Sequence, residues 1–482
     1  MFDELRREFE RLLGVNSVIS DPAGLRTYEC DGLTGYRVVP RLVLLPRSKD
    51  EVAQAVRICA RDGISFVARG AGTGLSGGAL PEADGIVISL QRLGRILHID
   101  ADNHRAVVEP GVINLDISRA VAEHGLYFAP DPSSQQVCTI GGNFAENSGG
   151  AHCLKYGFTL HHILGATVVL PNGMIVELGS GSPMSEGYDL LGVLIGSEGT
   201  LGIVVEIVVN LLPKPAAVKT LVADFDDMVQ ACRTVSEIIA SGIIPAAIEL
   251  MDTLAIEAVE VAVGAGYSRD SAAALIVELD GPAVEVETQF REVCAICARR
   301  GTTGVRIAAD PAERAMIWKG RKAAFAAMGR ISPNYFVQDG VVPRTRLAEA
   351  LARIVQLGAA ASLRVANVFH AGDGNLHPLV LYSEALGEHD KAEELSTRIA
   401  ELCVELGGSL SGEHGIGSDK ACSMPRQFTP EDLAVMRLLR EAFDPDGISN
   451  PNKVLPSPRL CGELPGPYRR HPLEAAGIAE RM

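Results

Sequence analysis

The chain alternates short apolar segments with amphipathic ones. The apolar segments at 42–46, 64–70, 85–90 and 106–109 have the length of strands. Between the first two, residues 51–62 carry apolar side chains at helical spacing. The first part of the chain is therefore predicted to mix strands and helices.

The alternation continues beyond Pro213 and Pro215, which mark a predicted domain boundary. Strands separated by helices in this order predict a ferredoxin-like α+β unit. The expected strands are 219–225, 246–250, 273–279 and 304–308, and the expected helices between them are 226–240, 253–263 and 283–300.

The last third of the chain predicts more helices and one hairpin. Two apolar segments, 363–369 and 378–382, flank a polar turn and should pair as antiparallel strands. The Pro-rich, charged residues 456–482 are expected to form a tail. The further helices are expected near 311–328, 344–360, 386–406 and 430–442.

Length and composition limit the class of protein. A chain of 482 residues with 47% hydrophobic residues and 50 glycines suits an enzyme of two or three domains. The net charge of −16 and the lack of a basic run make nucleic acid an unsuitable partner. The chain has no run of 18 apolar residues, so no membrane-spanning helix is expected. Residues 1–13 lack the apolar core of a signal peptide. We expect a cytoplasmic protein that meets a membrane only peripherally or through its partners.

The ten cysteines are scattered and are expected to stay reduced. Cys294 and Cys297 form a C-x-x-C pair, but they lie within a predicted helix and are interpreted as packing residues. No group of four closely spaced cysteines could hold an iron–sulfur cluster.

A glycine-rich segment at 69–78, RGAGTGLSGG, follows one of the predicted strands. It contains both G-x-G-x-x-G, a dinucleotide-binding pattern, and G-x-S-x-G, a hydrolase nucleophile turn. Both patterns need a helix immediately afterwards, and the glycines and proline at 77–85 leave no room for one. A phosphate-binding loop between strands and a flexible surface loop remain as interpretations.

More glycine-rich turns follow at 139–150 and 195–202, with a proline-rich turn at 130–134. Backbone that a ligand can approach closely therefore occurs at four points within about 140 residues. One phosphate does not need four such backbone segments, whereas an extended dinucleotide cofactor does.

A second candidate site lies in the predicted hairpin. His370 and His377 bracket its polar turn, and the hairpin should bring both imidazoles together. Glu413 and His414 follow in another glycine-bearing loop. Two histidines and one carboxylate are the ligand set of an open catalytic metal site, whereas solvated loop histidines are the alternative.

At this point the chain resembles the FAD-linked oxidases that share the flavin fold of vanillyl-alcohol oxidase and p-cresol methylhydroxylase. Within them it is most similar to the flavin subunits of glycolate oxidase, which are related to D-lactate and D-2-hydroxyglutarate dehydrogenases. The resemblance runs from about residue 40 to 456. It rests on RGAGTGLSGGA (69–79), TIGGN (139–143), IGSEGTLGI (195–203), WKGRKAAF (318–325), FHAGDGNLHP (369–378), GEHGIG (412–417) and FDPDGISNPNK (443–453).

The resemblance implies an α+β fold with a p-cresol methylhydroxylase-type FAD-binding domain of two subdomains, a ferredoxin-like substrate or cap domain, and a C-terminal helical segment. The implied limits are 1–37 for a helical lead-in, 38–216 for the FAD domain, 217–425 for the cap domain with the metal site, 426–456 for a segment returning to the FAD domain, and 457–482 for the tail.

The resemblance also implies the FAD site. The 69–78 loop would hold the pyrophosphate. Covalent members of the superfamily carry a histidine where this chain has Thr73, so non-covalent FAD is expected. The implied cofactor residues are Arg69, Gly70, Gly72, Thr73, Gly74, Leu75, Ser76, Gly77, Pro130, Thr139, Gly141, Gly142, Asn143, Asn147, Gly149, Glu198, Gly199, Gly202, Ile203, Asn450 and Asn452.

In metal-containing relatives the ligands match His370, His377 and Glu413. A divalent ion, Zn, Mn or Fe, is therefore implied. The implied catalytic residues are His414 as a general base, Arg321 as a clamp for the substrate carboxylate, and Asn375 in the loop between the two histidines.

One departure from the relatives concerns the substrate. Relatives that oxidise 2-hydroxyglutarate carry polar or basic groups for the second carboxylate where this chain has Phe325 and Val337. Apolar side chains there disfavour a second carboxylate. We expect a short 2-hydroxy acid, with glycolate first and D-lactate as the alternative. Electrons would pass to an iron–sulfur partner subunit beside a second flavin-type subunit, or to a quinone, because the chain has no cluster motif of its own.

Two other classes remain open from the residues alone. A zinc hydrolase would use the two histidines and Glu413 with a metal-bound water, but it leaves the glycine loops without a role. A non-catalytic FAD-binding subunit would not need His414, Arg321 or the metal ligands.

Overall fold

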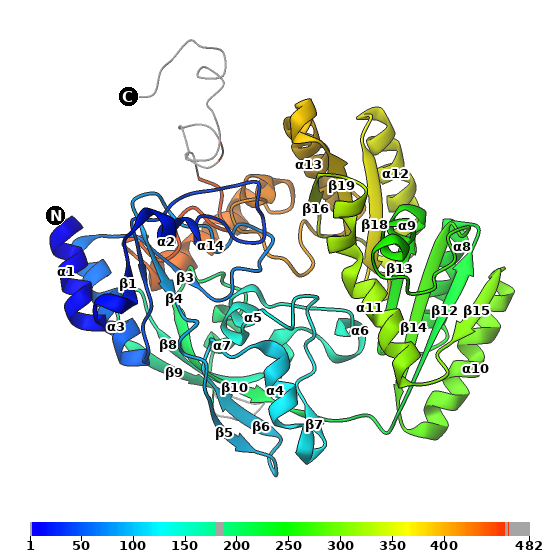
Figure 1. The fold of residues 1–482 in the computed structure, drawn as a ribbon, viewed down its shortest axis with the longest axis horizontal. Coiled ribbons are helices and arrows are strands. Elements are labelled where there is room, and N and C mark those ends of the chain that lie inside the picture. Colours follow the sequence, from blue (N-terminus) through cyan, green and yellow to red (C-terminus); the bar gives the residue numbers. More distant parts are fainter. Residues whose placement is uncertain (1, 180–186, 458–460, 462–482) are drawn as a thin grey trace. The chain divides into compact units, whose positions relative to one another are not determined.

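The computed structural model describes residues 2–179, 187–457 and 461, and they form two compact units (Figure 1). Unit 1 comprises Met1–Ser148, Phe158–Pro213 and His414–Met482. Unit 2 comprises Gly149–Gly157 and Lys214–Glu413. Each unit has its own sheets and apolar core, and each is described by itself.

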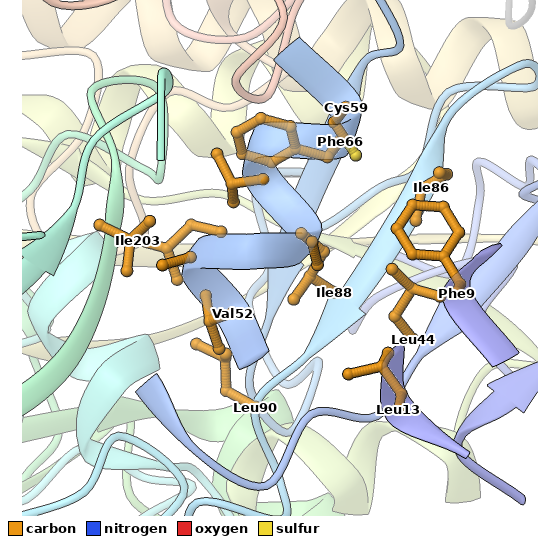
Figure 2. Close-up of a cluster of buried hydrophobic side chains, with 14 of the residues drawn as sticks. Phe9, Leu13, Leu44, Val52, Cys59, Phe66, Ile86, Ile88, Leu90 and Ile203 are labelled. Carbon is orange, nitrogen blue, oxygen red and sulfur yellow. The ribbon is translucent and has the colours of Figure 1, made fainter. Parts of the chain in front are cut away.

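Unit 1 begins with a four-stranded sheet in the order β1-β2-β4-β3, whose last three strands are parallel. Phe9 of the N-terminal helix, Val52 and Cys59 of the next long helix, and Phe66 and Ile88 of the sheet bury their side chains together (Figure 2). The elements are α1 (Phe2–Leu13), β1 (Val18–Ile19), α2 (Pro22–Arg26), β2 (Leu42–Leu44), α3 (Lys49–Asp62), β3 (Phe66–Arg69) and β4 (Ile86–Ser89).

Local signals fix α3 at both ends. The Ser48 side chain accepts a hydrogen bond from Glu51 N–H, and the Glu51 carboxylate accepts one from Arg47 N–H. Gly63 ends the helix in the left-handed conformation, at φ +63°. The helix predicted at 51–62 is therefore confirmed as Lys49–Asp62.

The second sheet of unit 1 is antiparallel, in the order β5-β6-β10-β8-β9. Its apolar face packs with α4 and α5. The elements are β5 (Ile96–Asp100), β6 (Arg105–Val108), α4 (Asn114–Ala120), β7 (Leu126–Tyr127), α5 (Ile140–Glu146), β8 (Ile163–Val169), β9 (Ile175–Gly179), α7 (Leu190–Leu194), β10 (Ile203–Asn210) and β11 (Leu212–Pro213). After unit 2, the chain adds α14 (Pro430–Phe443) to unit 1.

Unit 2 is built on one antiparallel sheet, ordered β15-β12-β14-β13-β18-β19-β16, with β17 also paired to β19. Its first four strands have the order of a ferredoxin-like unit with one added helix, α9, so that prediction is confirmed. The strands are β12 (Ala217–Phe225), β13 (Ala247–Asp252), β14 (Ala273–Gly281), β15 (Gly304–Ile307), β16 (Asn334–Val337), β17 (Gly340–Val341), β18 (Arg364–His370) and β19 (Asn375–Tyr382).

Helices α9 and α11 bury their apolar side chains against one face of this sheet. Side chains along a strand alternate between faces, so Met251, Ile276, Val368 and Leu379 all point toward α9 and α11. The helices of unit 2 are α6 (Cys153–Tyr156), α8 (Met228–Ala240), α9 (Thr253–Ala262), α10 (Ala283–Arg299), α11 (Pro311–Ala327), α12 (Leu347–Ala360) and α13 (His389–Glu405).

Two expectations need correction. The sequence predicts reduced cysteines, but Cys422 and Cys461 form a disulfide, with Cα atoms 5.5 Å apart. The 39-residue separation between them carries no signal of this pairing. The segment predicted as a glycine-rich turn at 139–150 instead begins with the helix α5, because the Thr139 side chain accepts a hydrogen bond from Gly142 N–H.

Within the described residues, no helix is both long and apolar enough to cross a membrane. Most of the predicted tail, residues 458–460 and 462–482, lies outside the described part of the chain.

Candidate functional site

The glycine-rich loop of unit 1 connects β3 to β4, and it contains no helix. This excludes both the Rossmann turn and the hydrolase turn. Among the described residues, the backbone N–H groups of residues 71–76 donate no hydrogen bond to the rest of the protein. The Ser76 hydroxyl is buried, and it also has no hydrogen-bond partner among the described residues. Consecutive free N–H groups are what an anion such as a phosphate needs.

Backbone conformation explains part of the glycine content. Gly72 and Gly77 adopt φ values of +70° and +75°, which side-chain-bearing residues rarely adopt. A Cβ on Gly70 would collide with Thr139 Oγ1, the cap of α5. A Cβ on Gly74, in contrast, would have no protein atom nearer than 3.9 Å. The protein thus leaves space beside Gly74.

Asn114 at the start of α4 joins two of the predicted cofactor segments, although it is not among the predicted site residues. Its side-chain amide donates to Pro130 C=O at 3.1 Å and to Asn143 Oδ1 at 3.2 Å. Asn114 is 2% exposed, and no motif or spacing in the sequence singles it out.

The C-terminal segment returns to this loop within unit 1. Phe66 N–H donates to Ile448 C=O, and Asn450 N–H donates to Phe66 C=O, beside β3. The Asn450 side chain donates to Gly78 C=O at 2.8 Å and to Glu198 C=O at 2.6 Å. Residues far apart in the sequence therefore meet at the glycine-rich loop, as the resemblance implies.

The Glu198 carboxylate holds the chain just after His414. It accepts hydrogen bonds from Ile416 N–H and Gly417 N–H, both at 2.7 Å. Burial raises the pKa of Glu198 to about 7, although these two hydrogen bonds oppose the rise. Burial and the neighbouring Glu198 raise the pKa of Glu146 well above its usual value.

Most of the predicted cofactor residues lie in unit 1, but Gly149 falls in the segment that belongs to unit 2. Arg69 is 7% exposed, and its guanidinium group lies directly against Gly72. Ile203 has its side chain in the core of the first sheet (Figure 2), so only its backbone is available to a cofactor. Asn452 donates to Glu82 at 3.2 Å.

The predicted hairpin of unit 2 is confirmed as β18 and β19, which pair His370 with Asn375 across the turn. Because side chains alternate between the two faces of a strand, His370 lies on the same face as Val368, and His377 lies on the same face as Leu379. The two imidazole rings consequently lie together, with centroids 5.1 Å apart.

Glu413 completes the group of candidate metal ligands. Its Oε1 lies 3.2 Å from His370 Nε2 and 3.1 Å from His377 Nε2. A tetrahedral ion with bonds of about 2.0–2.2 Å holds its ligand atoms roughly 3.3–3.6 Å apart. The Glu413 oxygen therefore lies close to the distance from each imidazole nitrogen that a divalent ion of the size of zinc requires, and all three ligand atoms lie within 4.8 Å of one another.

Neighbouring groups orient these ligands. His370 Nδ1 lies 2.7 Å from Glu249 Oε1, and His377 Nδ1 lies 3.3 Å from Gln338 C=O, so both rings direct Nε2 toward Glu413. The Asp339 carboxylate accepts hydrogen bonds from Gly412 N–H at 3.0 Å and Glu413 N–H at 3.1 Å. Neither Glu249 nor Asp339 is among the residues predicted for the site.

Electrostatics keep the Glu413 carboxylate charged. Burial would raise its pKa, but His370 and His377 outweigh burial and hold the pKa well below its usual value. Burial would lower the pKa of His370, but Glu249 and Glu413 raise it well above its usual value. A bound cation would take the place of that proton.

Arg321 projects from α11 toward the same face of the sheet and is 3% exposed. Its Nη2 lies 2.5 Å from Glu249 Oε2, but the alignment is that of an ion pair and not of a hydrogen bond. Among the described residues, Arg321 Nε and Asn375 Oδ1 have no hydrogen-bond partner. Buried polar atoms are normally paired, so these atoms fit a polar ligand.

Comparisons with known proteins find matches to both parts of the chain. The family profile "FAD linked oxidases, C-terminal domain" matches residues 214–454, and "FAD binding domain" matches residues 40–179. The "Glycolate oxidase subunit GlcD" of Escherichia coli (strain K12) is 49% identical over 445 residues, 92% of this chain and 89% of the relative. GlcD of Bacillus subtilis (strain 168) is 38% identical over 94% of this chain and 96% of the relative.

A "D-lactate dehydrogenase" of Anaerostipes hadrus is 33% identical over 86% of this chain and 89% of the relative. The crystal structure of p-cresol methylhydroxylase with substrate bound superposes with a TM-score of 0.78 at 16% identity, over 94% of this chain and 96% of that one. At that identity the likeness shows the fold alone.

Proposed function

Because this chain belongs to the FAD-linked oxidases and is an FAD-dependent oxidoreductase of hydroxy acids, we propose that it oxidises glycolate to glyoxylate. D-lactate, the substrate named for another relative, is the second candidate. The observation that carries the proposal is that Arg321 Nε and Asn375 Oδ1 are buried and have no hydrogen-bond partner among the described residues. Such atoms suit a small anionic acid. Glu249 joins Arg321 to His370, and Asn375 pairs with His370 across the hairpin.

Each residue has a distinct proposed task. Arg321 would bind the carboxylate through its guanidinium group, whose Nε has no hydrogen-bond partner among the described residues. Asn375 would contact the substrate through its side-chain amide, whose Oδ1 has no hydrogen-bond partner among the described residues. His414, which follows the metal ligand Glu413 directly in the chain, would take the hydroxyl proton.

Two groups supply chemistry that side chains cannot. The glycine-rich loop would hold FAD, which would supply a hydride acceptor. His370, His377 and Glu413 would hold a divalent ion, which would supply a Lewis acid for the substrate hydroxyl.

Phe325 supports a small substrate. Its ring meets the His377 ring edge to face, with centroids 5.4 Å apart. Val337 packs in the apolar cluster beside α9 and α11. A second carboxylate near these side chains would lose its hydration and find no cation from them. This favours glycolate and D-lactate over 2-hydroxyglutarate.

Steady-state rates with a dye acceptor test the substrate assignment. We expect kcat/KM to be highest for glycolate, lower for D-lactate, and lowest for L-lactate and D-2-hydroxyglutarate. A preference for D-2-hydroxyglutarate would contradict the argument from Phe325.

The electrons must leave the flavin for a further acceptor. The GlcD relatives reported above are named as subunits. We propose that the electrons pass either to a second flavin-type subunit and an iron–sulfur subunit, or to a quinone. The expectation of a cytoplasmic protein, with any membrane contact through those partners, remains part of this proposal.

FAD should be released by acid. Thr73 offers no imidazole for a covalent bond to the flavin. After acid precipitation, we expect the yellow colour in the supernatant, measured by its flavin absorbance. Colour that stays with the washed pellet would contradict non-covalent binding.

His370→Ala and His377→Ala should each lose the metal and the activity but keep FAD. The ligand atoms of both histidines lie in unit 2, whereas the glycine-rich loop lies in unit 1. Metal content measured by mass spectrometry and flavin content measured by absorbance separate the two effects. Unchanged metal content in both variants would exclude these histidines as ligands.

A further inference from the structure

Glu249 connects two parts of the proposed site through one carboxylate. It lies on β13 and is completely buried. Its Oε1 lies 2.7 Å from His370 Nδ1, and its Oε2 lies 2.5 Å from Arg321 Nη2. A buried carboxylate is costly unless charged or polar partners compensate it, and here both partners are proposed functional residues.

The position of Glu249 follows from the register of the sheet. Glu249 is paired with His370 across β13 and β18, and both side chains point to the face that carries α11. On α11, Arg314, Trp318 and Arg321 follow one another at intervals of four and three residues, so they form one stripe above this face.

We propose that Glu249 is a positioning residue that sets the metal affinity through His370 and aligns Arg321 for the substrate carboxylate. This inference rests on the proposed function, since it assigns Glu249 to the same site. When His370 donates Nδ1–H to Glu249, the lone pair of Nε2 is free for the cation. The same carboxylate restrains the Arg321 guanidinium, whose fork must face the substrate in one orientation.

Glu278 provides a matched control on the neighbouring strand. It is 1% exposed, lies on the same face of the sheet, and pairs with Arg314 and Trp318 of α11. Neither of these partners is a proposed metal ligand or substrate contact. Glu278 also contacts His152 and Thr220. Glu249→Gln and Glu278→Gln therefore each remove one buried charge from the same face of the sheet, but only the first one touches the proposed site.

The first measurement is the affinity of the purified, flavin-loaded protein for Zn²⁺, by competition with a chromophoric chelator. We expect Glu249→Gln to weaken it about 10- to 100-fold, the usual loss when a group that orients a metal ligand is removed. Glu278→Gln should leave it unchanged. Equal affinities in Glu249→Gln and the wild type, or equal losses in both variants, would overturn the inference.

The second measurement is the binding of oxalate, a two-carbon acid that cannot be oxidised at a C–H bond, at saturating Zn²⁺. Glu249→Gln should bind oxalate more weakly, because Arg321 is no longer held in place. Unchanged or tighter binding would overturn the role toward Arg321. A wild-type protein that binds neither Zn²⁺ nor oxalate would refute the proposed site itself, whereas normal wild-type binding with an unaffected Glu249→Gln variant would refute only this inference.

Discussion

His414→Ala is expected to slow the anaerobic reduction of bound flavin by glycolate about 100- to 10,000-fold, the usual contribution of a general base. The glycolate concentration for half-maximal reduction rate should change far less, since Arg321 and the proposed metal ligands remain. Stopped-flow absorbance measures both quantities. The loop of His414 stays anchored in the variant, because Glu198 holds Ile416 and Gly417 through their backbone N–H groups.

His98→Ala is the matched control, because His98 is exposed on β5 and has no proposed role. It should reduce its flavin at the wild-type rate. If His414→Ala does so as well, the assignment of the base is wrong, and a metal-bound hydroxide becomes the better candidate.

Gly74→Val should empty the flavin site while much of the fold is retained. The protein itself offers room for the new side chain, since no atom lies within 3.9 Å of a Cβ at Gly74. The loss would therefore come from the branched side chain occupying the space of the phosphate. The ratio of flavin to protein absorbance after purification measures the effect.

Gly329→Val is a suitable control. A Cβ at Gly329 meets no atom within 4 Å, and its backbone does not adopt a positive φ. This variant should keep its flavin. Normal flavin content in Gly74→Val would remove the glycine-rich loop from the cofactor site.

The sequence predicts turns, hairpins and loops whose conformation is determined by residues close together in the chain. The hairpin around His370 and His377 follows from two apolar segments and a polar turn, and the structure confirms it. The glycine-rich loop follows from glycine spacing without a following helix, and it indeed connects two strands. The roles of the residues in both places remain predictions.

The groups that surround these residues could not be predicted in the same way. Glu249 stands 121 residues before His370, and only the pairing of β13 with β18 brings them together. Asn114, Asp339 and the carboxylate of Glu198 likewise act through tertiary contacts that no spacing encodes. The helix α5 was not predicted because a single cap, Thr139, outweighs the poor helix propensity of two glycines.

Anaerobic titration of the purified protein with glycolate tests the central claim most directly. The account predicts a yellow protein whose flavin absorbance is bleached by about one equivalent of glycolate per flavin, because a hydride transfer reduces one flavin. Protein that contains FAD but is bleached by neither glycolate nor D-lactate would contradict the proposed function.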